Sequence, residues 1–428
     1  MKISIPYGYQ KIYFSLPEEN LAEILAPKTV VLRKSEEKEI FEAINNPIGT
    51  RKLREMVHPS DKIVILCEDI SRFAHTNKIL IYLLNYLNEY GIEDKNISII
   101  IALGSHRPMT KKEIKKKVGE EVFARIKVKN SEFKDKKNLV DMGFAPGNVK
   151  MWIDKRVISA DIKIGVGSIV PHPALGYTGG GKIIFPGVAG EETVAQLHLR
   201  SALFGGNIMG WADNPIRKEM EEWVKTMGLD FIVNAVVTPE NKTYKIIAGD
   251  YVEAHRRGII YAQEIYEIVA REKVDVAIVS SHTADWDFWQ GAKGVIAGER
   301  IVKNEGTLIL LAPCFEGIGP HPSYIDYIGS DSCEKFIREA WEGKMDKKEI
   351  LPLSVGALIA RIRKRIKLSL ISDGITYKDA RRAKFDYFEN IGEALDNVFQ
   401  QYGERIRISV MPYGGDSYSY VKESMNYF

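Results

Sequence analysis

DKIVILCEDISR, at residues 61–72, joins a short apolar run to a cluster of polar residues. The apolar run at 61–67 is typical of a buried strand. A helix is expected next, with Thr76 as its cap and Gly91 at its end. A buried strand followed by a helix is the repeating unit of α/β proteins, and this stretch therefore decides the fold class.

The same unit recurs along the chain. Apolar runs that end in polar residues lie at 96–104, 161–167 and 274–280, and TKKE at 110–113 forms a capping box for the helix after the first of them. Strands that alternate with helices favour parallel sheets. We therefore expect an α/β fold with mainly parallel sheets flanked by helices. Further strand and helix patterns continue it at 307–313, 333–343, 366–372 and 408–415.

The chain is expected to form two lobes. The stretch at 253–273 predicts an amphipathic helix that is long enough to join them. We place an N-terminal catalytic and cofactor-binding α/β domain at 1–270 and a C-terminal α/β domain at 271–428. Two further elements precede the first strand, a hairpin at 3–14 and a helix at 35–46 with Ser35 as its cap.

The composition is that of a globular protein, with 45% hydrophobic and 27% charged residues. A chain of 428 residues can bury a large core without a disulfide or a structural metal. The net charge of +3 and the dispersed basic residues argue against nucleic-acid binding. The longest apolar stretches, such as 97–103, are far shorter than the ~20 residues of a membrane span, and the N-terminus lacks a signal-peptide pattern. The three cysteines, Cys67, Cys314 and Cys333, lack the close spacing of a disulfide framework or a zinc site, and we expect a cytoplasmic protein.

Two of the eight histidines follow predicted strands, where the ligands of open α/β sheets bind. His106 comes directly after the run at 96–104, and His172 lies between two prolines that fix its backbone. Histidine is the side chain best suited to move protons near neutral pH. We therefore predict that His106 and His172 flank one substrate.

His198 lies in an expected helix, ETVAQLHLRS. A lone histidine on a helix is usually packed or solvated. The functional interpretation is a metal ligand, although a single imidazole is a weak metal site unless other donors complete the coordination. The sequence has no HExxH pattern, which argues against a zinc protease.

GYTGGGKI at 176–183 matches most of a phosphate-binding P-loop. Ile183 stands where Ser or Thr should bind magnesium, and Pro186 prevents a helix from starting at once, so a nucleoside triphosphatase fits poorly. Consecutive glycines still let backbone N–H groups approach an anion. Lys182 could pair with a phosphate or act as a nucleophilic amine; the plain alternative is a flexible turn with a solvated lysine.

Two further pairs of residues could bind an acidic substrate. Asp69 and Arg72 follow the first predicted strand, and arginine binds carboxylates in a planar fork; a structural ion pair is the alternative. Gln290 and Lys293 lie three residues apart and would share a helix face. The alternative for this pair is an exposed helix surface.

With these residues assembled, the chain resembles the nickel-dependent lactate racemase family. The resemblance covers most of the chain, and its most specific element is VPHPALGYTGGGKIIFPGVAG at 170–190. The other motifs occur in order along the chain: CEDISR at 67–72, ALGSHRPMT at 102–110, HLRSALFG at 198–205, NPIRKEMEE at 214–222 and DFWQGAKG at 287–294.

The resemblance implies a site between the two lobes and a nickel-pincer nucleotide as cofactor. This cofactor is a pyridinium-3-thioamide-5-thiocarboxylic acid mononucleotide that holds nickel. The resemblance further implies that Lys182 carries it through a thioamide bond and that His198 is the protein ligand of nickel. Gly179, Gly180 and Gly181 would let the backbone approach the cofactor, and Asp69 would orient its neighbours. Separate maturation proteins would make the cofactor.

The implied activity is racemisation or epimerisation of a 2-hydroxy acid by proton-coupled hydride transfer through a 2-keto acid. His106 and His172 would be the acid/base pair on opposite faces of the substrate, one for each enantiomer. The residues that would hold the substrate are Arg72, Gln290 and Lys293.

The chain departs from the family pattern at several positions near these residues. Ser71-Arg72-Phe73 replaces the usual Thr-Arg-Pro and is followed by Ala74-His75, and His282-Thr283 stands where Tyr-Pro is expected. Ser105 replaces threonine and Trp289 replaces tyrosine. Such changes are expected to line the substrate pocket. A larger or more polar 2-hydroxy acid than lactate, including a sugar acid, is therefore open.

Two other functions stay open at this stage. The chain could be a non-catalytic ligand-binding protein of the same fold, although His106 and His172 are both present. A nucleotide-binding phosphotransferase would use the glycine loop, and Ile183 argues against it.

Overall fold

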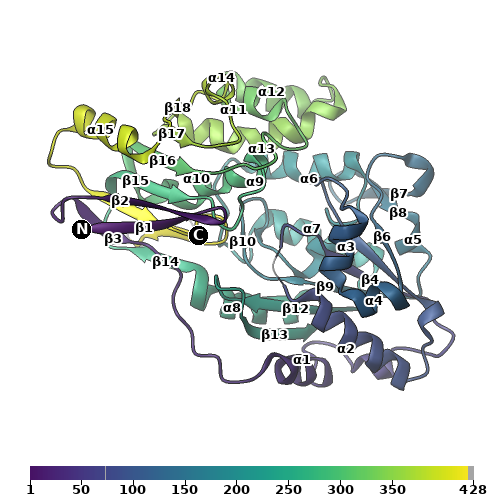
Figure 1. Cartoon of the computed structure of the whole chain (residues 1–428). Helices are drawn as coiled ribbons and strands as arrows, with labels where there is room; N and C mark the ends of the chain where they lie inside the picture. Colours follow the sequence, from purple (N-terminus) through teal and green to yellow (C-terminus); the bar gives the residue numbers. More distant parts are fainter. Residues whose placement is uncertain (73, 423–428) are drawn as a thin grey trace.

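The computed structural model describes residues 1–72 and 74–422 and contains two six-stranded sheets, each in a lobe of its own (Figure 1). The first sheet has the strand order β13-β12-β9-β4-β5-β6. All its neighbours are parallel except β12 and β13, which pair antiparallel. Its strands are β4 (Ile63–Glu68), β5 (Ile97–Ala102), β6 (Lys127–Asn130), β9 (Ile162–Ser168), β12 (Phe231–Val237) and β13 (Thr243–Gly249).

The second sheet is wholly parallel, with the order β18-β17-β16-β15-β19-β3. The expected α/β class with mainly parallel sheets is confirmed. The strands are β3 (Leu21–Ile24), β15 (Val274–Ser280), β16 (Val302–Leu311), β17 (Lys367–Ile371), β18 (Asp386–Tyr387) and β19 (Ile408–Met411).

The apolar runs of the sequence become the central strands because helices cover both faces of each sheet. All six residues of β4 are buried, as are all seven of β12. The helix after β4 is α2 (Thr76–Glu89), and its N-cap is His75 rather than the expected Thr76. The Thr76 hydroxyl instead donates to the carbonyl of Ala74. The capping box at Thr110 and Glu113 is present and starts α3 (Lys111–Val118).

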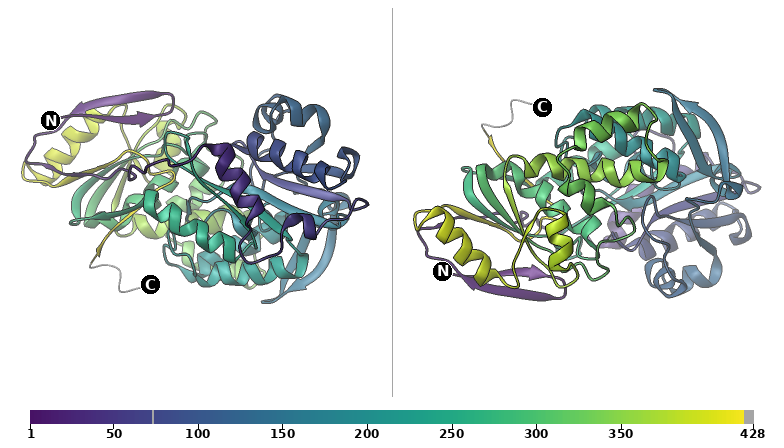
Figure 2. Two further views of the ribbon diagram at one scale, coloured as in Figure 1. Left: turned by 90° about the horizontal axis from the view of Figure 1, so that it is seen from below. Right: turned by 90° about the horizontal axis from the view of Figure 1, so that it is seen from above.

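Both ends of the chain contribute to the second lobe. The N-terminal hairpin, β1 (Lys2–Tyr7) and β2 (Gln10–Ser15), packs its buried residues against β15 and β19, and β3 pairs with β19. Both views in Figure 2 place the purple hairpin beside the yellow-green C-terminal part of the chain. The proposed domain boundary at 270 thus needs a refinement, because the chain before α1 (Glu36–Asn45) lies with the second sheet.

The expected helix at 253–273 is shorter than predicted. It is α8 (Glu253–Tyr266), and β14 (Glu267–Ala270) follows at once and pairs with β20 (Tyr418–Val421). The residues of β14 alternate, with Ile268 and Ala270 buried, which is the period of a strand rather than a helix. Within the part of the chain that the structure describes, no helix is long and apolar enough to cross a membrane.

Candidate active site

A pocket lies where the carboxyl ends of β4, β5 and β9 face two short helices of the other lobe, α9 (Phe288–Gly291) and α10 (Lys293–Gly298). We call it the first pocket. Parallel sheets bind ligands at this edge. Ten of the predicted site residues line it: Asp69, Arg72, His106, His172, Gly179, Lys182, His198, Trp289, Gln290 and Lys293.

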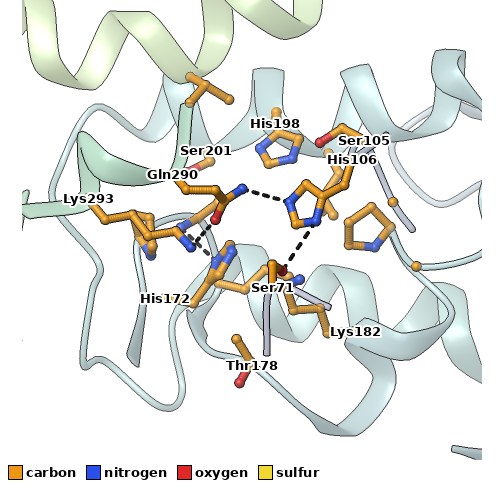
Figure 3. A pocket seen from close by; sticks show the side chains of 18 of the residues that line it. Ser71, Ser105, His106, His172, Thr178, Lys182, His198, Ser201, Gln290 and Lys293 are labelled. Atoms are coloured by element: carbon orange, nitrogen blue, oxygen red, sulfur yellow. Dashed lines mark hydrogen bonds between the residues drawn. The ribbon is translucent and has the colours of Figure 1, made fainter. Parts of the chain in front are cut away.

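The His106 ring is held from both sides. Its Nδ1 lies 2.5 Å from Oδ2 of Asp69, and its Nε2 lies 2.7 Å from the Gln290 amide nitrogen (Figure 3). An ionised carboxylate only accepts hydrogen bonds, so Nδ1 carries a proton, and the Gln290 amide N–H points at Nε2 as an acceptor. Burial raises the pKa of the Asp69 carboxyl, but the charge and hydrogen bonds of His106, together with the Ser71 hydroxyl, outweigh it and lower the pKa below its usual value.

The His172 ring has the opposite proton arrangement. Its Nδ1 accepts a hydrogen bond of 3.2 Å from the backbone N–H of Ala174. Burial, together with the charges of Lys182 and Lys293, lowers the pKa of His172 well below its usual value, so the ring is neutral. A neutral ring that accepts at Nδ1 carries its proton at Nε2. His172 can therefore donate a hydrogen bond through Nε2–H where His106 can accept one through Nε2.

Lys182 lies in a short 3-10 turn, Gly180–Ile183, and lines the same pocket. Burial, followed by the positive charge of Arg72, lowers the pKa of its amine to about 7. A substantial fraction of this amine is neutral at neutral pH, and a neutral amine is a nucleophile. The partly buried position of Lys182 and its lowered pKa argue against the plain alternative of a solvated lysine.

The three glycines before Lys182 have different surroundings. Gly179 has a φ of +76° and lines the pocket. A Cβ on Gly180 would lie 2.8 Å from the His255 ring, and one on Gly181 would lie 2.8 Å from Val224. Gly180 and Gly181 do not line the first pocket. They are needed for close packing inside the protein, which corrects the expectation that all three glycines open a path to a ligand.

His198 comes from α6 (Glu191–Phe204) and points a neutral ring at the pocket (Figure 3). Burial, aided by the charge of Lys182, lowers its pKa to about 3. Among residues 1–72 and 74–422, no hydrogen bond occupies its ring nitrogens, and no group of three or more His, Cys, Asp or Glu side chains could hold a metal ion. A neutral imidazole without a partner can bind a metal ion, provided that other donors complete the coordination.

The cationic residues come from both lobes. Lys293 donates to the Oε1 atom of Gln290, although the two residues belong to successive short helices, α10 and α9, rather than one shared helix face. Burial and the charge of Arg72 lower the pKa of Lys293 well below its usual value. Arg72 donates to the Ser71 carbonyl, and the described residues include no ion pair between Arg72 and Asp69. The side chains of Arg72 and Lys293 are therefore available to bind a substrate carboxylate.

Trp289 lines the pocket as expected, with its ring centroid 4.7 Å from that of His321. The predicted pocket position Phe73 lies outside the described residues.

Sequence reasoning missed three residues that hold the site in shape. Arg217, on α7 (Pro215–Met227), is fully buried and donates to the carbonyls of Leu175 and Tyr177 in the loop that carries His172. Glu68 accepts from the backbone and hydroxyl of Ser168. The Asn234 side chain accepts from the Gly180 N–H at 2.8 Å. Asn234 is the only polar residue in FIVNAVV, and a lone buried polar residue in an apolar strand was the signal to follow.

The comparisons with known proteins agree over nearly the whole chain. The lactate racemase N-terminal domain model matches residues 7–207, and the lactate racemase C-terminal domain model matches 269–416. The lactate racemase of Thermoanaerobacterium thermosaccharolyticum is 29% identical, covering 96% of this chain and 97% of its own. That of Lactiplantibacillus plantarum is 27% identical, covering 96% of this chain and 98% of its own.

Solved structures give the same result. The lactate racemase apoprotein of T. thermosaccharolyticum superposes with a TM-score of 0.87 at 28% identity, over 98% of this chain and all of that one. A Thermotoga maritima protein superposes with a TM-score of 0.71 at 20% identity, over 90% of this chain and 98% of that one, which concerns the fold alone. The two domain models in order, the full-length relatives and the shared fold together place this chain in the lactate racemase family, whose named members are racemases and therefore isomerases.

Proposed function

We propose that the protein racemises or epimerises a 2-hydroxy acid, with a nickel-pincer nucleotide as its cofactor. The observation that carries the proposal is the presence of two imidazoles, His106 and His172, in one pocket with the low-pKa amine of Lys182. Their hydrogen bonds leave different ring nitrogens facing the pocket, Nε2 as an acceptor in His106 and Nε2–H in His172. A racemase must serve both configurations of its substrate, and two imidazoles in one pocket give it an acid/base group for each.

The residues present fit such a cofactor. Lys182 offers a neutral amine for covalent attachment, and His198 offers a neutral nitrogen with no partner among the described residues. Since these residues hold no complete ligand set, a group that binds here must supply the remaining metal donors itself. When bound, the nickel-pincer nucleotide supplies a hydride acceptor. Maturation proteins that make it would be the partners of this chain.

The side chains of this protein would then bind, orient and move protons. Arg72 lies in the pocket as a cation for the substrate carboxylate, Lys293 adds N–H donors to the same pocket, and Gln290 reaches the His106 ring from the other lobe. The Nε2 atom of His106 takes the hydroxyl proton of one enantiomer, and Asp69 stabilises the positive ring that results. His172 would take the hydroxyl proton of the other enantiomer, and a ring that has become a cation in this way can return its proton to the product.

The substrate class follows from the relatives only in part. The named relatives are lactate racemases, which supports lactate as a substrate. The replaced positions around the pocket support a larger or more polar 2-hydroxy acid.

The first experiment measures the intact mass and the nickel content of protein produced together with the maturation proteins. We expect an adduct mapped to Lys182, nickel in proportion to that adduct, and loss of optical rotation from a single enantiomer of a 2-hydroxy acid. Lys182→Arg is the matched control, because it keeps a positive charge but offers no comparable nucleophile. An unmodified mass without nickel, under conditions in which a lactate racemase is loaded, would contradict the proposal.

A further inference from the structure

A second pocket of about 430 Å³ lies between the lobes beside the first. The two pockets share Ser71, Arg72 and Ser168, so they adjoin each other at these residues. Lys182 and His198 line only the first. The volume lies within the ~300–1,000 Å³ typical of small-molecule sites. A ligand held at Arg72 can therefore extend away from the cofactor residues into this space.

Two imidazoles from opposite lobes line the second pocket. His282 Nδ1 lies 2.6 Å from Oδ2 of Asp285, whose other oxygen accepts from Ser281. His75 Nδ1 pairs with Glu36. In each case Nε2 has no protein partner among the residues that the structure describes. The His282 arrangement repeats the one that holds His106 against Asp69 and Ser71, although nothing in the proposed mechanism uses it.

The rest of this wall favours hydroxyl groups over a second carboxylate. Asp416 accepts from the Thr283 hydroxyl through Oδ2, and Oδ1 is left without a described partner. Asp285 and Asp416 would repel an anion but accept hydrogen bonds from hydroxyls. Trp286 and the stacked rings of Tyr9 and Phe315, 5.3 Å apart, give apolar surface for carbon–hydrogen groups. Lys116, an exposed cation at the opposite rim, is the feature that would suit an acidic chain.

Five of the positions at which the chain departs from the pattern of the family it resembles line this pocket, namely Ser71, Ala74, His75, His282 and Thr283. Two others, Ser105 and Trp289, line the first pocket. Side chains that line the second pocket and lie outside the proposed acid/base pair are placed to set which substrate is accepted.

We propose that the second pocket binds the side chain of the substrate, and that this substrate is a 2-hydroxy acid whose chain carries further hydroxyl groups. This inference rests on the proposed racemase or epimerase function. The carboxylate lies at Arg72, and the chain passes between the lobes to His282 and Asp416, which take its hydroxyls. His282 is then a specificity-determining residue.

The test compares gluconate, as a polyhydroxylated probe, with lactate on the cofactor-loaded enzyme. We expect a higher kcat/KM for gluconate. His282→Phe keeps a ring of similar size and removes its hydrogen bonds, so the ratio of kcat/KM for gluconate over lactate should fall roughly tenfold, as for the loss of one or two hydrogen bonds. His58→Phe, at an exposed histidine outside both pockets, is the matched control and should leave the ratio unchanged.

A second measurement does not depend on turnover. Quenching of tryptophan fluorescence, to which Trp286 contributes, should report gluconate binding to the loaded protein, with a Kd raised by His282→Phe and by Asp416→Asn. Two results would overturn the inference but leave the proposed function intact. One is a preference of the enzyme for lactate or for a dicarboxylic 2-hydroxy acid. The other is a kcat/KM ratio that His282→Phe leaves unchanged, together with a Kd for gluconate that neither His282→Phe nor Asp416→Asn raises. If the loaded enzyme inverts no 2-hydroxy acid at all, the proposed function itself fails.

Discussion

Lys182 illustrates, at the scale of a single residue, how burial converts a common surface residue into a reactive one. Its pKa falls from 10.5 to about 7, and the neutral amine therefore becomes the major form as the pH rises above neutrality. The same burial keeps His172 and His198 uncharged. One pocket thus holds an amine and two imidazoles whose pKa values favour the uncharged forms, as the proposed roles of these residues require.

This pKa predicts the pH dependence of labelling in the unloaded protein. A small acylating reagent should modify Lys182 with a midpoint near pH 7 and roughly tenfold more slowly at pH 6 than at its plateau, because the protonated amine does not react. Peptide mapping after brief exposure measures it. The exposed Lys116 is the internal reference in the same digest, and identical pH profiles for the two lysines would contradict the prediction.

The Asp69–His106 contact predicts a second effect. Asp69→Asn removes the charge that stabilises the protonated ring, and kcat/KM should fall by roughly 10²–10⁴. Ser71→Ala keeps the carboxylate and should lower kcat/KM by less than about tenfold.

The same residue predicts a change in stability with pH. Because the pKa of Asp69 is lowered on folding, its ionised form adds stability near neutral pH that is lost as the pH falls. The free energy of unfolding of D69N should therefore fall less between neutral and acidic pH than that of the unchanged protein. An equal fall in the two proteins would contradict this prediction.

The residues that line the first pocket were easier to predict than those that support them. His106, His172 and Lys182 stand out because their side chains follow strands or glycines. Glu68 acts through Ser168, which is 100 residues away, and no local pattern records such a partner.

At the scale of elements, α7 fixes the loop that carries His172. Arg217 reaches from the helix to two carbonyls of that loop, and it pairs with Glu221, which Arg256 also holds. A buried guanidinium with several acceptors cannot be removed without leaving those acceptors unpaired.

Arg217→Met should therefore lower the free energy of unfolding by about 2–4 kcal/mol. Urea unfolding measures this loss. Lys218→Met, at the exposed neighbouring position, is the matched control and should change stability by less than about 0.5 kcal/mol. If the free energy of unfolding fell no more in R217M than in K218M, the loop that carries His172 would not depend on Arg217, which would contradict the prediction.

The sequence predicted elements best where one signal acted alone. The strands at 274–280 and 96–104 and the helix capped by Ser35 follow from an apolar run or a cap. Sequence reasoning missed α13 (Lys347–Arg363) for two reasons. Pro352 lies inside this helix, where a proline normally argues against one. Most residues of the helix are buried, so it lacks the alternation of apolar and polar faces that marks a surface helix. Sequence reasoning also missed β14, where a helix pattern gives way to alternation within a few residues.

At the scale of the whole molecule, the two lobes meet through polar contacts as well as through the pocket. Arg107 pairs with Glu316 across the cleft, at 2.7 and 2.9 Å, and with Glu113 of its own lobe. These hydrogen bonds lower the pKa of Glu113 to about 2. The two-lobed arrangement was predictable from strand–helix alternation, whereas contacts between residues 209 positions apart were not.

The Arg107–Glu316 pair is partly exposed, which predicts a modest and salt-dependent coupling. A double-mutant cycle of unfolding free energies with Arg107→Ala and Glu316→Ala should give a coupling below about 1 kcal/mol that shrinks at high salt. A second cycle, with Glu113→Ala in place of Glu316→Ala, gives the coupling of the Arg107–Glu113 pair within one lobe for comparison. A coupling that is large and insensitive to salt would contradict this prediction, because it would mean that the ion pair is shielded from water.

The pairing of β3 with β19 joins residues 21–24 to 408–411 and has a consequence for synthesis on the ribosome. The first sheet is complete once residue 249 has emerged, because all its strands lie before that point. Strand β3 is made before the first sheet but stays without its neighbour until β19 has emerged. The growing chain therefore carries this unpaired strand while the first sheet forms, and this is the segment that a chaperone would have to shield.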